Sequence, residues 1–177
     1  LVDEKRQLHL MKAIDMKRSK MSGGGSAGNT VVAVNQFGGK SFYSCLVAKD
    51  DLGKFFLEDL KRNGVDTNLK HENTPEGHTG RCLVMTSPDA ERTMNTFLGA
   101  SQFLGRDALD PALIANGAIL YLEGYLWNAD ASRAAMAEAI GIAKAAGRRV
   151  AFTLSDTFVI AAHGEDFRRM ISAGDID

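Results

Sequence analysis

The first third of the chain alternates helical and extended patterns of hydrophobic residues. Between Val2 and Ile14, apolar residues recur at helical spacing among charged ones, which predicts an amphipathic helix. The run Val31 to Phe37 stops at Gly38-Gly39 and predicts a buried helix, although its valines also suit a strand. Ser41 to Val47 predicts a strand, and Asp50 to Gly64 predicts a second amphipathic helix. A strand followed by a helix and a glycine is typical of an α/β unit.

The pattern changes between Val65 and Ala100, where helical spacing disappears. Leu83 to Thr86 and Arg92 to Leu98 are rich in β-type residues, and a Ser87-Pro88-Asp89 turn lies between them. This segment therefore predicts antiparallel β-structure inserted into an α/β chain.

After the insert, the sequence returns to alternating helices and strands. The expected elements are a helix at 107–115, a strand at 118–122, a helix at 130–146, a strand at 149–154 and a helix from Asp166. Strands separated by helices predict parallel pairing. We therefore expect a parallel sheet between helices, with residues 1–64 as the first part of the α/β core, 65–100 as the β insert, and 101–177 as the second part.

Composition narrows the class of protein without pointing to a function. Of the 177 residues, 45% are hydrophobic and 24% are charged, which is ordinary for a globular protein. The net charge of −1 and the scattered basic residues argue against nucleic-acid binding. No apolar run approaches the roughly 20 residues that cross a bilayer, and the N-terminus lacks a signal peptide pattern. We expect a cytoplasmic protein that does not bind membranes.

The cysteines and histidines do not predict a disulfide or a metal site. Cys45 and Cys82 are isolated within apolar stretches and are expected to be reduced and buried. The four histidines (His9, His71, His78 and His163) lack the spacing of metal ligands. We therefore predict no metal site in this chain.

The strongest local signal is the glycine-rich segment Gly23 to Asn29, which immediately precedes the expected helix. Glycines let a ligand approach the backbone, and free amides at a helix start bind polar groups. A flexible linker is the competing interpretation. Asn29 favours a binding loop, because a half-buried amide in an apolar helix needs a partner such as a ligand hydroxyl. The segment lacks the lysine of a P-loop and the preceding strand of a dinucleotide fingerprint, which disfavours triphosphate binding there.

Seven short motifs follow one another along the chain: Gly24-Gly25-Ser26-Ala27-Gly28-Asn29-Thr30, Phe37-Gly38-Gly39, Val47 to Gly53, Gly64-Val65-Asp66-Thr67, Thr79-Gly80, Glu91-Arg92-Thr93 and Gly99-Ala100. Their order and spacing resemble the ribokinase (PfkB) superfamily of small-molecule kinases. The resemblance covers nearly the whole chain. Departures are Val31, where the family prefers a small residue, and Ala48-Lys49, where it usually shows Gly-Asp; both fall in the scaffold.

Within the superfamily, Leu122-Glu123-Gly124-Tyr125 and Leu154 to Phe158 are most similar to the adenosine-kinase branch. The resemblance implies that Tyr125 stacks on an adenine and that Phe158 forms a second wall. The alternative is that both aromatic residues belong to the core. The glycine loop would bind the acceptor through Gly24, Gly25, Ser26 and Asn29, and Glu123 would contact substrate or a phosphate-bound cation unless it is simply a polar residue at a strand end.

The resemblance also implies the reaction and the fold. The family transfers the γ-phosphoryl group of ATP, with Mg²⁺, to a hydroxyl of a sugar or nucleoside, and carries a small β lid on its parallel sheet. Arg92 resembles the lid arginine that approaches the transferring phosphate, with a solvated hairpin arginine as the equal alternative. The Gly-Ala-Gly-Asp stretch that carries the base aspartate does not occur in the sequence, and the resemblance places the Asn-x-x-Glu motif linked to Mg²⁺ just past Asp177.

These absences lead us to expect that the chain is truncated at both ends and holds the acceptor-binding portion of a kinase, inactive by itself. Two other functions remain open: a sugar kinase acting on ribose, fructose or a keto-deoxy sugar acid, and a non-catalytic binding module. A sugar needs hydroxyl partners but no aromatic platform, so stacking aromatics discriminate between the first two. The resemblance also allows a homodimer formed through the lid.

Overall fold

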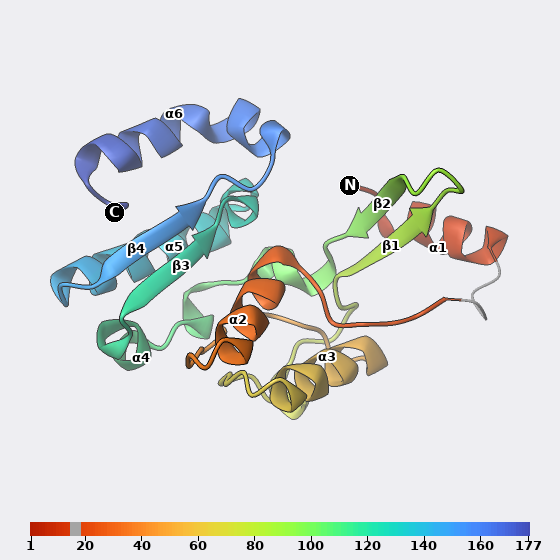
Figure 1. Cartoon of the computed structure of the whole chain (residues 1–177), viewed down its shortest axis with the longest axis horizontal. Helices are drawn as coiled ribbons and strands as arrows, with labels where there is room; N and C mark the ends of the chain where they lie inside the picture. The colour runs from red at the N-terminus through yellow and green to blue at the C-terminus, as the bar shows by residue number, and fades with distance from the viewer. Residues whose placement is uncertain (15–18) are drawn as a thin grey trace.

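The chain folds into three neighbouring groups of helices and strands, and this computed structural model describes residues 1–14 and 19–177 (Figure 1). Its helices are α1 (Glu4–Ala13), α2 (Ser26–Gln36), α3 (Asp51–Arg62), α4 (Pro111–Asn116), α5 (Asp130–Ala145) and α6 (Thr157–Ala173), and its strands are β1 (Arg81–Thr86), β2 (Arg92–Phe97), β3 (Ile119–Glu123) and β4 (Arg149–Thr153). No helix within the described residues is long and apolar enough to cross a membrane.

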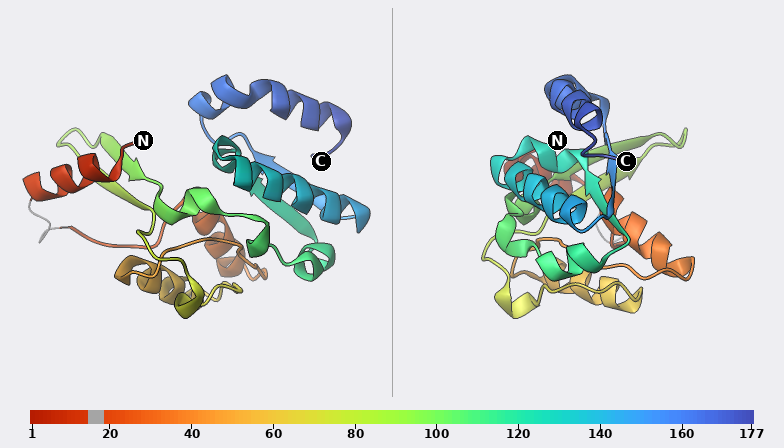
Figure 2. Two further views of the ribbon diagram at one scale, coloured as in Figure 1. Left: turned by 180° about the vertical axis from the view of Figure 1, so that it is seen from behind. Right: turned by 90° about the vertical axis from the view of Figure 1, so that its left-hand side faces the viewer.

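The C-terminal group is the α/β unit that the sequence predicts. Strands β3 and β4 pair in parallel, with Ile119 opposite Arg149 and Glu123 opposite Thr153. Helix α5 connects them and packs against both, and α6 lies along the β4 side of the unit (Figure 2). This part of the sequence is therefore an α/β structure, and the expected parallel pairing is confirmed for these two strands.

One hydrophobic core holds the C-terminal group together. It is built from the buried residues Leu122, Trp127, Met136, Ile140, Ala143, Val150, Val159, Phe167 and Met170. The rings of Phe152 and Phe167 meet edge to face at a centroid distance of 5.0 Å, and Trp127 packs edge to face on both. Edge-to-face contacts of this kind add to the stabilisation that area burial already provides. The core therefore packs against β3 and β4 and fixes the position of both strands.

Helices α2 and α3 share a second, smaller core. Its buried residues are Cys45, Leu60 and Val65, with Val31, Val32, Tyr43, Phe56, Leu57 and Leu69 packed around them. The strand expected at Ser41 to Val47 is wrong as a regular strand: among the described residues this segment forms one parallel bridge, Phe42 to Asp66. The segment is apolar because it crosses the core, and it makes no regular ladder because no described strand lies beside it.

The antiparallel strands expected within the insert are confirmed as one hairpin, formed by β1 and β2. Arg81 pairs with Phe97 and Thr86 with Arg92, so β1 and β2 are in register along their whole length. Helix α1 covers one face, where Gln7 is fully buried and donates from Nε2 to the carbonyl oxygens of Arg81 (3.1 Å) and Asn95 (2.8 Å). The N-terminal helix therefore packs with the hairpin, away from the β3 and β4 strands (Figure 1).

Two glycines allow the hairpin to leave the body of the protein. A Cβ on Gly80 would lie 2.5 Å from the carbonyl oxygen of Leu98, and a Cβ on Gly99 would lie 2.3 Å from that of His78. Gly99 also has a φ of 53°, a left-handed conformation that favours glycine. The segments that enter and leave the hairpin, at Gly80 and Gly99, can therefore run in close contact with each other.

Three helix starts differ from the sequence expectation. Helix α6 begins at Thr157 rather than Asp166, because Asp156 caps it by accepting from the Phe158 amide. The β-branched residues that follow obscure this start in the sequence. Helix α4 begins only at Pro111, and α2 begins at Ser26, so the last glycine-loop residues are already helical.

Candidate functional site

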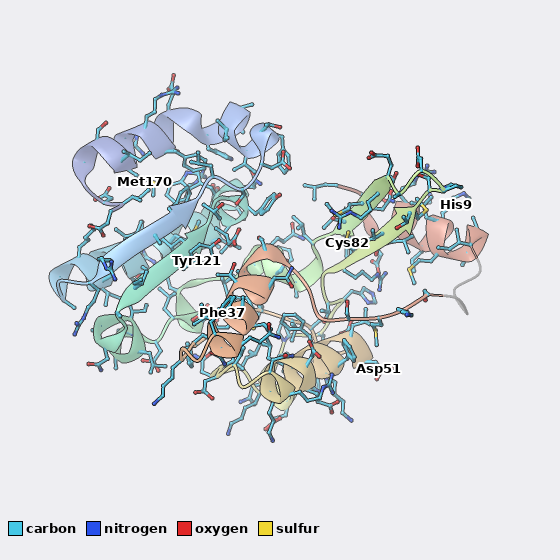
Figure 3. All side chains as sticks on the ribbon, in the orientation of Figure 1. His9, Phe37, Asp51, Cys82, Tyr121 and Met170 are labelled. Carbon is cyan, nitrogen blue, oxygen red and sulfur yellow. The ribbon has the colours of Figure 1, made fainter. Side chains whose placement is uncertain are left out.

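The predicted acceptor residues lie where the start of α2 meets the carboxyl ends of β3 and β4. Helix α2 runs beside β3, the strand on which Tyr121 is labelled in Figure 3. Ligands of α/β proteins bind outside the carboxyl ends of parallel strands, and helix starts offer free amides for polar groups. The fold therefore brings two kinds of binding element to one edge of the sheet.

The glycine loop presents an open backbone at this edge. Gly25 caps α2 with a φ of 93° and without a side-chain cap, and a Cβ on Gly24 or Gly25 would meet nothing within 4 Å. Asn29 is exposed, so the expectation that its amide is half-buried is wrong. The helix turns the Asn29 side chain outward because Ala27 and Gly28 take the inner positions. The Asn29 amide is therefore accessible to a ligand in this conformation.

Glu123 is the buried centre of the site. This last residue of β3 is 5% exposed, and its carboxylate accepts hydrogen bonds from three hydroxyl groups. Ser26 donates to Oε2 at 2.7 Å, Ser155 donates to the same oxygen at 3.3 Å, and Tyr121 donates to Oε1 at 2.9 Å. The structure thus joins Glu123 to the glycine loop through Ser26.

Tyr125 and Phe158 form an exposed aromatic pair. Their ring centroids lie 6.0 Å apart at an interplanar angle of 42°, and the two residues are 38% and 45% exposed. Neither belongs to the C-terminal core, so the alternative that both are core residues is wrong. Partial burial raises the pKa of the Tyr125 hydroxyl, and the nearby Asp156 carboxylate, 3.5 Å from the hydroxyl oxygen, raises it further.

An open hollow of about 750 Å³ lies at the end of β4 and reaches Ser155 and Asp156, the two residues that hydrogen-bond to Tyr125. It is lined by Phe152, Thr153, Leu154, Ser155, Asp156, Thr157 and Ile160. Aromatic surface next to backbone and side-chain polar groups suits a ligand with a flat apolar part and hydroxyl groups.

The sequence reading missed two residues that complete the hydrogen bonds around Glu123. Ser155 accepts from the Tyr125 amide at 3.1 Å while it donates to Glu123, and it has a φ of 67°, which is rare for a residue other than glycine. Tyr121 lies two positions before Glu123 and so shares its face of β3. The sequence did contain a signal for each residue. Ser155 belongs to the polar residues that directly follow β4, and Tyr121 is two positions from Glu123, so the two side chains lie on the same face of the strand.

Arg92 lies in a different place. It is the exposed first residue of β2, next to the hairpin turn, which projects away from α2 and β3 (Figure 1). The described residues provide no hydrogen bond or ion pair to its guanidinium group. In this structure, therefore, Arg92 is not brought together with Glu123 and the aromatic pair.

No described part of the chain has the ligand set of a metal site. Residues 1–14 and 19–177 contain no group of three His, Cys, Asp or Glu side chains placed to hold an ion. Glu123 is surrounded by hydroxyl donors rather than by other carboxylates. We assign no residue of this chain to a metal.

The family follows from comparison with known proteins. Residues 3–175 match the model of the pfkB family of carbohydrate kinases, and the chain belongs to that family. It is similar to the solved adenosine kinase from Sinorhizobium meliloti, with 34% identity, a TM-score of 0.91, and coverage of 99% of this chain and 53% of that one.

Other relatives carry sugar-kinase names. A probable sugar kinase from Rhizobium etli shows 34% identity and a TM-score of 0.91, with 99% of this chain and 52% of that chain covered. Mouse ribokinase is 25% identical over 131 residues, which is 73% of this chain and 39% of the mouse protein. The chain thus spans about half the length of these solved structures, and less of the curated relatives.

Proposed function

We propose that the full-length protein transfers the γ-phosphoryl group of ATP to a hydroxyl of an adenosine-like nucleoside, and that this chain holds the acceptor-binding portion. Membership of the pfkB family supports a kinase acting on a small molecule. The observation that carries the choice of a nucleoside is the exposed pair of Tyr125 and Phe158, because a base has a π-face that stacks on aromatic rings and a sugar has none.

The acceptor would lie across the site with its two halves bound differently. The ribose hydroxyls would bind the open backbone of Gly24 and Gly25 and the side chains of Ser26 and Asn29. The base would lie against Tyr125, with Phe158 as the second wall. Phosphoryl transfer depends mainly on positioning and charge stabilisation, so holding the acceptor still is a catalytic contribution in itself.

The donor side of the reaction is assigned to no described residue. ATP would supply the phosphoryl group and Mg²⁺ would neutralise its charge, but the chain has neither the glycine-rich motif with a base aspartate nor a metal-ligand cluster among its described residues. We therefore expect the isolated 177-residue chain to produce no ADP in response to added nucleoside. Nucleoside-dependent ADP production by this chain would contradict us.

Replacing the stacking ring tests the nucleoside proposal. In the full-length protein, Tyr125→Ala should weaken adenosine binding about tenfold or more, because losing a stacked base costs on the order of 1–3 kcal/mol. Ribose binding should change little, and Tyr125→Phe should retain adenosine binding since it keeps the ring. Both can be measured by isothermal titration calorimetry. Equal losses for adenosine and ribose would indicate damage to the fold.

A sugar kinase is the second candidate, favoured by the sugar-kinase names of several relatives. If the wild-type protein bound ribose, fructose or a keto-deoxy sugar acid but no nucleoside, this candidate would replace the first. A non-catalytic binding module is the third, and it requires acceptor binding without any transfer by the full-length protein. Pairing of two copies through the hairpin stays a prediction that sedimentation equilibrium can test.

A further inference from the structure

Asp156 brings a carboxylate to the hydroxyl end of the Tyr125 ring. It is the residue that precedes α6, it is exposed, and it lines the open hollow at the end of β4. Its Oδ2 atom lies 3.5 Å from the Tyr125 hydroxyl oxygen. The two carboxylate oxygens have different surroundings, and these decide what each oxygen can bind.

The first oxygen, Oδ1, is engaged at the start of α6. It accepts a hydrogen bond from the Phe158 amide at 3.3 Å and one from the Thr157 hydroxyl at 3.1 Å. The first amides of a helix lack partners within the helix, and a side-chain acceptor at this position stabilises it. Oδ1 therefore holds the Asp156 carboxylate in one orientation and is already occupied.

The second oxygen, Oδ2, has room for a ligand. The contact that the described residues give it, from the Tyr125 hydroxyl, is longer than an ordinary O–H···O hydrogen bond. A carboxylate has about four acceptor positions and donates nothing. Oδ2 can therefore accept from a donor that enters the hollow, and it has nothing to offer to a second acceptor.

A base stacked on the Tyr125 ring would bring one of its edges to Oδ2. The hydroxyl group is at the end of that ring, and Oδ2 lies beside it. The edge of a base carries the atoms by which bases differ, since an exocyclic amino group donates a hydrogen bond and a carbonyl oxygen accepts one. Tyr125 is thus indifferent to the kind of base, whereas Asp156 is not.

We propose that Asp156 determines specificity within the candidate site, by selecting nucleosides whose base carries an exocyclic amino group that donates to Oδ2. This inference rests on the proposed function of the site and goes further by naming the chemical class of the base. An amino group gains a hydrogen bond to the carboxylate. An oxygen in the same place would face another acceptor and lose its contact with water without replacement.

Three ribosides isolate this contact in the full-length protein. Adenosine carries an amino group at the position in question, purine riboside carries hydrogen, and 6-methoxypurine riboside carries an acceptor oxygen. They share one sugar and one ring system, so the contributions of ribose binding and stacking largely cancel. The wild type should bind adenosine at least about tenfold more tightly than either of the other two, as measured by isothermal titration calorimetry.

Two substitutions change the group that faces the base and keep a residue that caps helices well. In Asp156→Asn the side-chain oxygen is held by the Phe158 amide, so the NH2 group takes the place of Oδ2 and donates. Adenosine should then bind about tenfold more weakly than to the wild type, and 6-methoxypurine riboside about threefold more tightly. The shorter side chain of Asp156→Ser does not reach the base, so adenosine and purine riboside should bind within about threefold of each other.

The outcomes separate this inference from the proposed function. Equal losses for all three ribosides in both variants, or an unchanged preference for adenosine in both, would overturn the selective role of Asp156 and leave a nucleoside site in place. If the wild type bound sugars and none of the ribosides, the proposed function would fail and Asp156 would select no base. Circular dichroism checks that α6 forms in both variants.

Ultraviolet titration tests the contact between Asp156 and Tyr125 without a ligand. Burial raises the pKa of the Tyr125 hydroxyl, and the Asp156 carboxylate raises it further. Asp156→Asn and Asp156→Ser should therefore both lower this pKa. The transition that is missing from Tyr125→Phe identifies the tyrosine concerned. An unchanged Tyr125 pKa in both variants would mean that Oδ2 does not lie beside the ring in solution, which would refute the inference.

Discussion

The β3–β4 unit and the hairpin with α1 are held together in different ways. In the β3–β4 unit, Trp127, Phe152 and Phe167 interlock edge to face within a continuous apolar core. The hairpin is a two-stranded sheet covered on one face by α1 through polar contacts of Gln7. Its other face leaves Val84 and Met94, which are 47% and 64% exposed, in solvent.

This difference in packing indicates which of the two regions is the more rigid. A two-stranded hairpin is marginally stable unless something packs on it, whereas an aromatic core fixes the strands that it supports. The residues proposed to bind the acceptor, Glu123, Tyr125 and Phe158, lie on or next to the strands of the β3–β4 unit. Arg92 lies on the hairpin, which has fewer packing contacts. The proposed acceptor platform is therefore in the unit with the larger apolar core.

The largest expected effect tests the core of the β3–β4 unit. Phe167→Ala should reduce the free energy of unfolding by about 3–5 kcal/mol, because it removes a buried ring at the centre of the aromatic contacts. Met94→Ala on the outer face of the hairpin is the matched control and should change it by less than about 0.5 kcal/mol. Urea denaturation measures both values. Similar losses for the two variants would mean that the hairpin is packed as tightly as the core.

The next effect tests how α1 holds the hairpin. Gln7→Ala removes two donated hydrogen bonds and the partner of the Arg81 guanidinium, whose Nη2 atom is already buried without a hydrogen bond. We expect a loss of about 2–3 kcal/mol. Hydrogen exchange should show this loss in β1 and β2, with β3 and β4 unaffected. The exposed His9 of the same helix provides the control, since His9→Ala should leave exchange unchanged (Figure 3). Faster exchange in all four strands would show that the two regions unfold together.

The two regions also differ in how far the sequence predicted them. β-type residues on either side of a turn were sufficient to predict the hairpin, and the alternation of helical and extended segments was sufficient for α5, β3 and β4. The pattern failed at Ser41 to Val47, where an apolar segment is buried but has no ladder partner in the described structure. Strand character depends on a neighbour, which local sequence does not contain.

Sequence motifs suggested the members of the candidate site but not the hydrogen bonds between them. The glycine-loop residues and Tyr125 were proposed from local motifs, because a turn and a strand end are local features. That Ser26 and Glu123 are hydrogen-bonded could not be found in this way, since nearly a hundred residues separate them in the sequence. Ser155 was missed because its role depends on a left-handed backbone conformation that serine rarely adopts.

A smaller effect, measured as a function of pH, tests the contact between Asp50 at the start of α3 and Thr79, which precedes the hairpin. Burial tends to raise the pKa of Asp50, but hydrogen bonds from the Thr79 hydroxyl, the Thr79 amide and the Gly53 amide outweigh it, so the pKa lies below its ordinary value. A carboxyl group with a lowered pKa stabilises the fold above its unfolded pKa of about 3.9, and this stabilisation is lost as pH falls through the folded pKa.

Asp50→Asn should accordingly lower the free energy of unfolding at neutral pH by about 1–2 kcal/mol. The new side-chain NH2 group would face one of the groups of Gly53 or Thr79 that donate to the carboxylate in the wild type. The difference from the wild type should begin to shrink below about pH 4, where Asp50 of the unfolded chain becomes protonated, and should shrink further as pH falls through the lower pKa of the folded state. Thermal unfolding followed by circular dichroism over this pH range measures it. Asp51→Asn, one residue further along the same helix start, is the control, and a constant difference across the whole pH range would show that Asp50 does not titrate as described.

The smallest effect on stability, and the sharpest test of what the hairpin does, is expected from Arg92. Its side chain is exposed and has no partner among the described residues, so Arg92→Ala should change the free energy of unfolding by less than about 0.5 kcal/mol. If the hairpin closes over the acceptor during the reaction, the guanidinium group would approach the transferring phosphate, and the full-length variant should lose at least about tenfold in kcat with the acceptor KM nearly unchanged. Arg92→Lys keeps the charge but not the fork of donors, and should recover only part of the rate. An unchanged kcat in Arg92→Ala would indicate that Arg92 is a solvated hairpin residue and that the hairpin contributes no charge to the reaction.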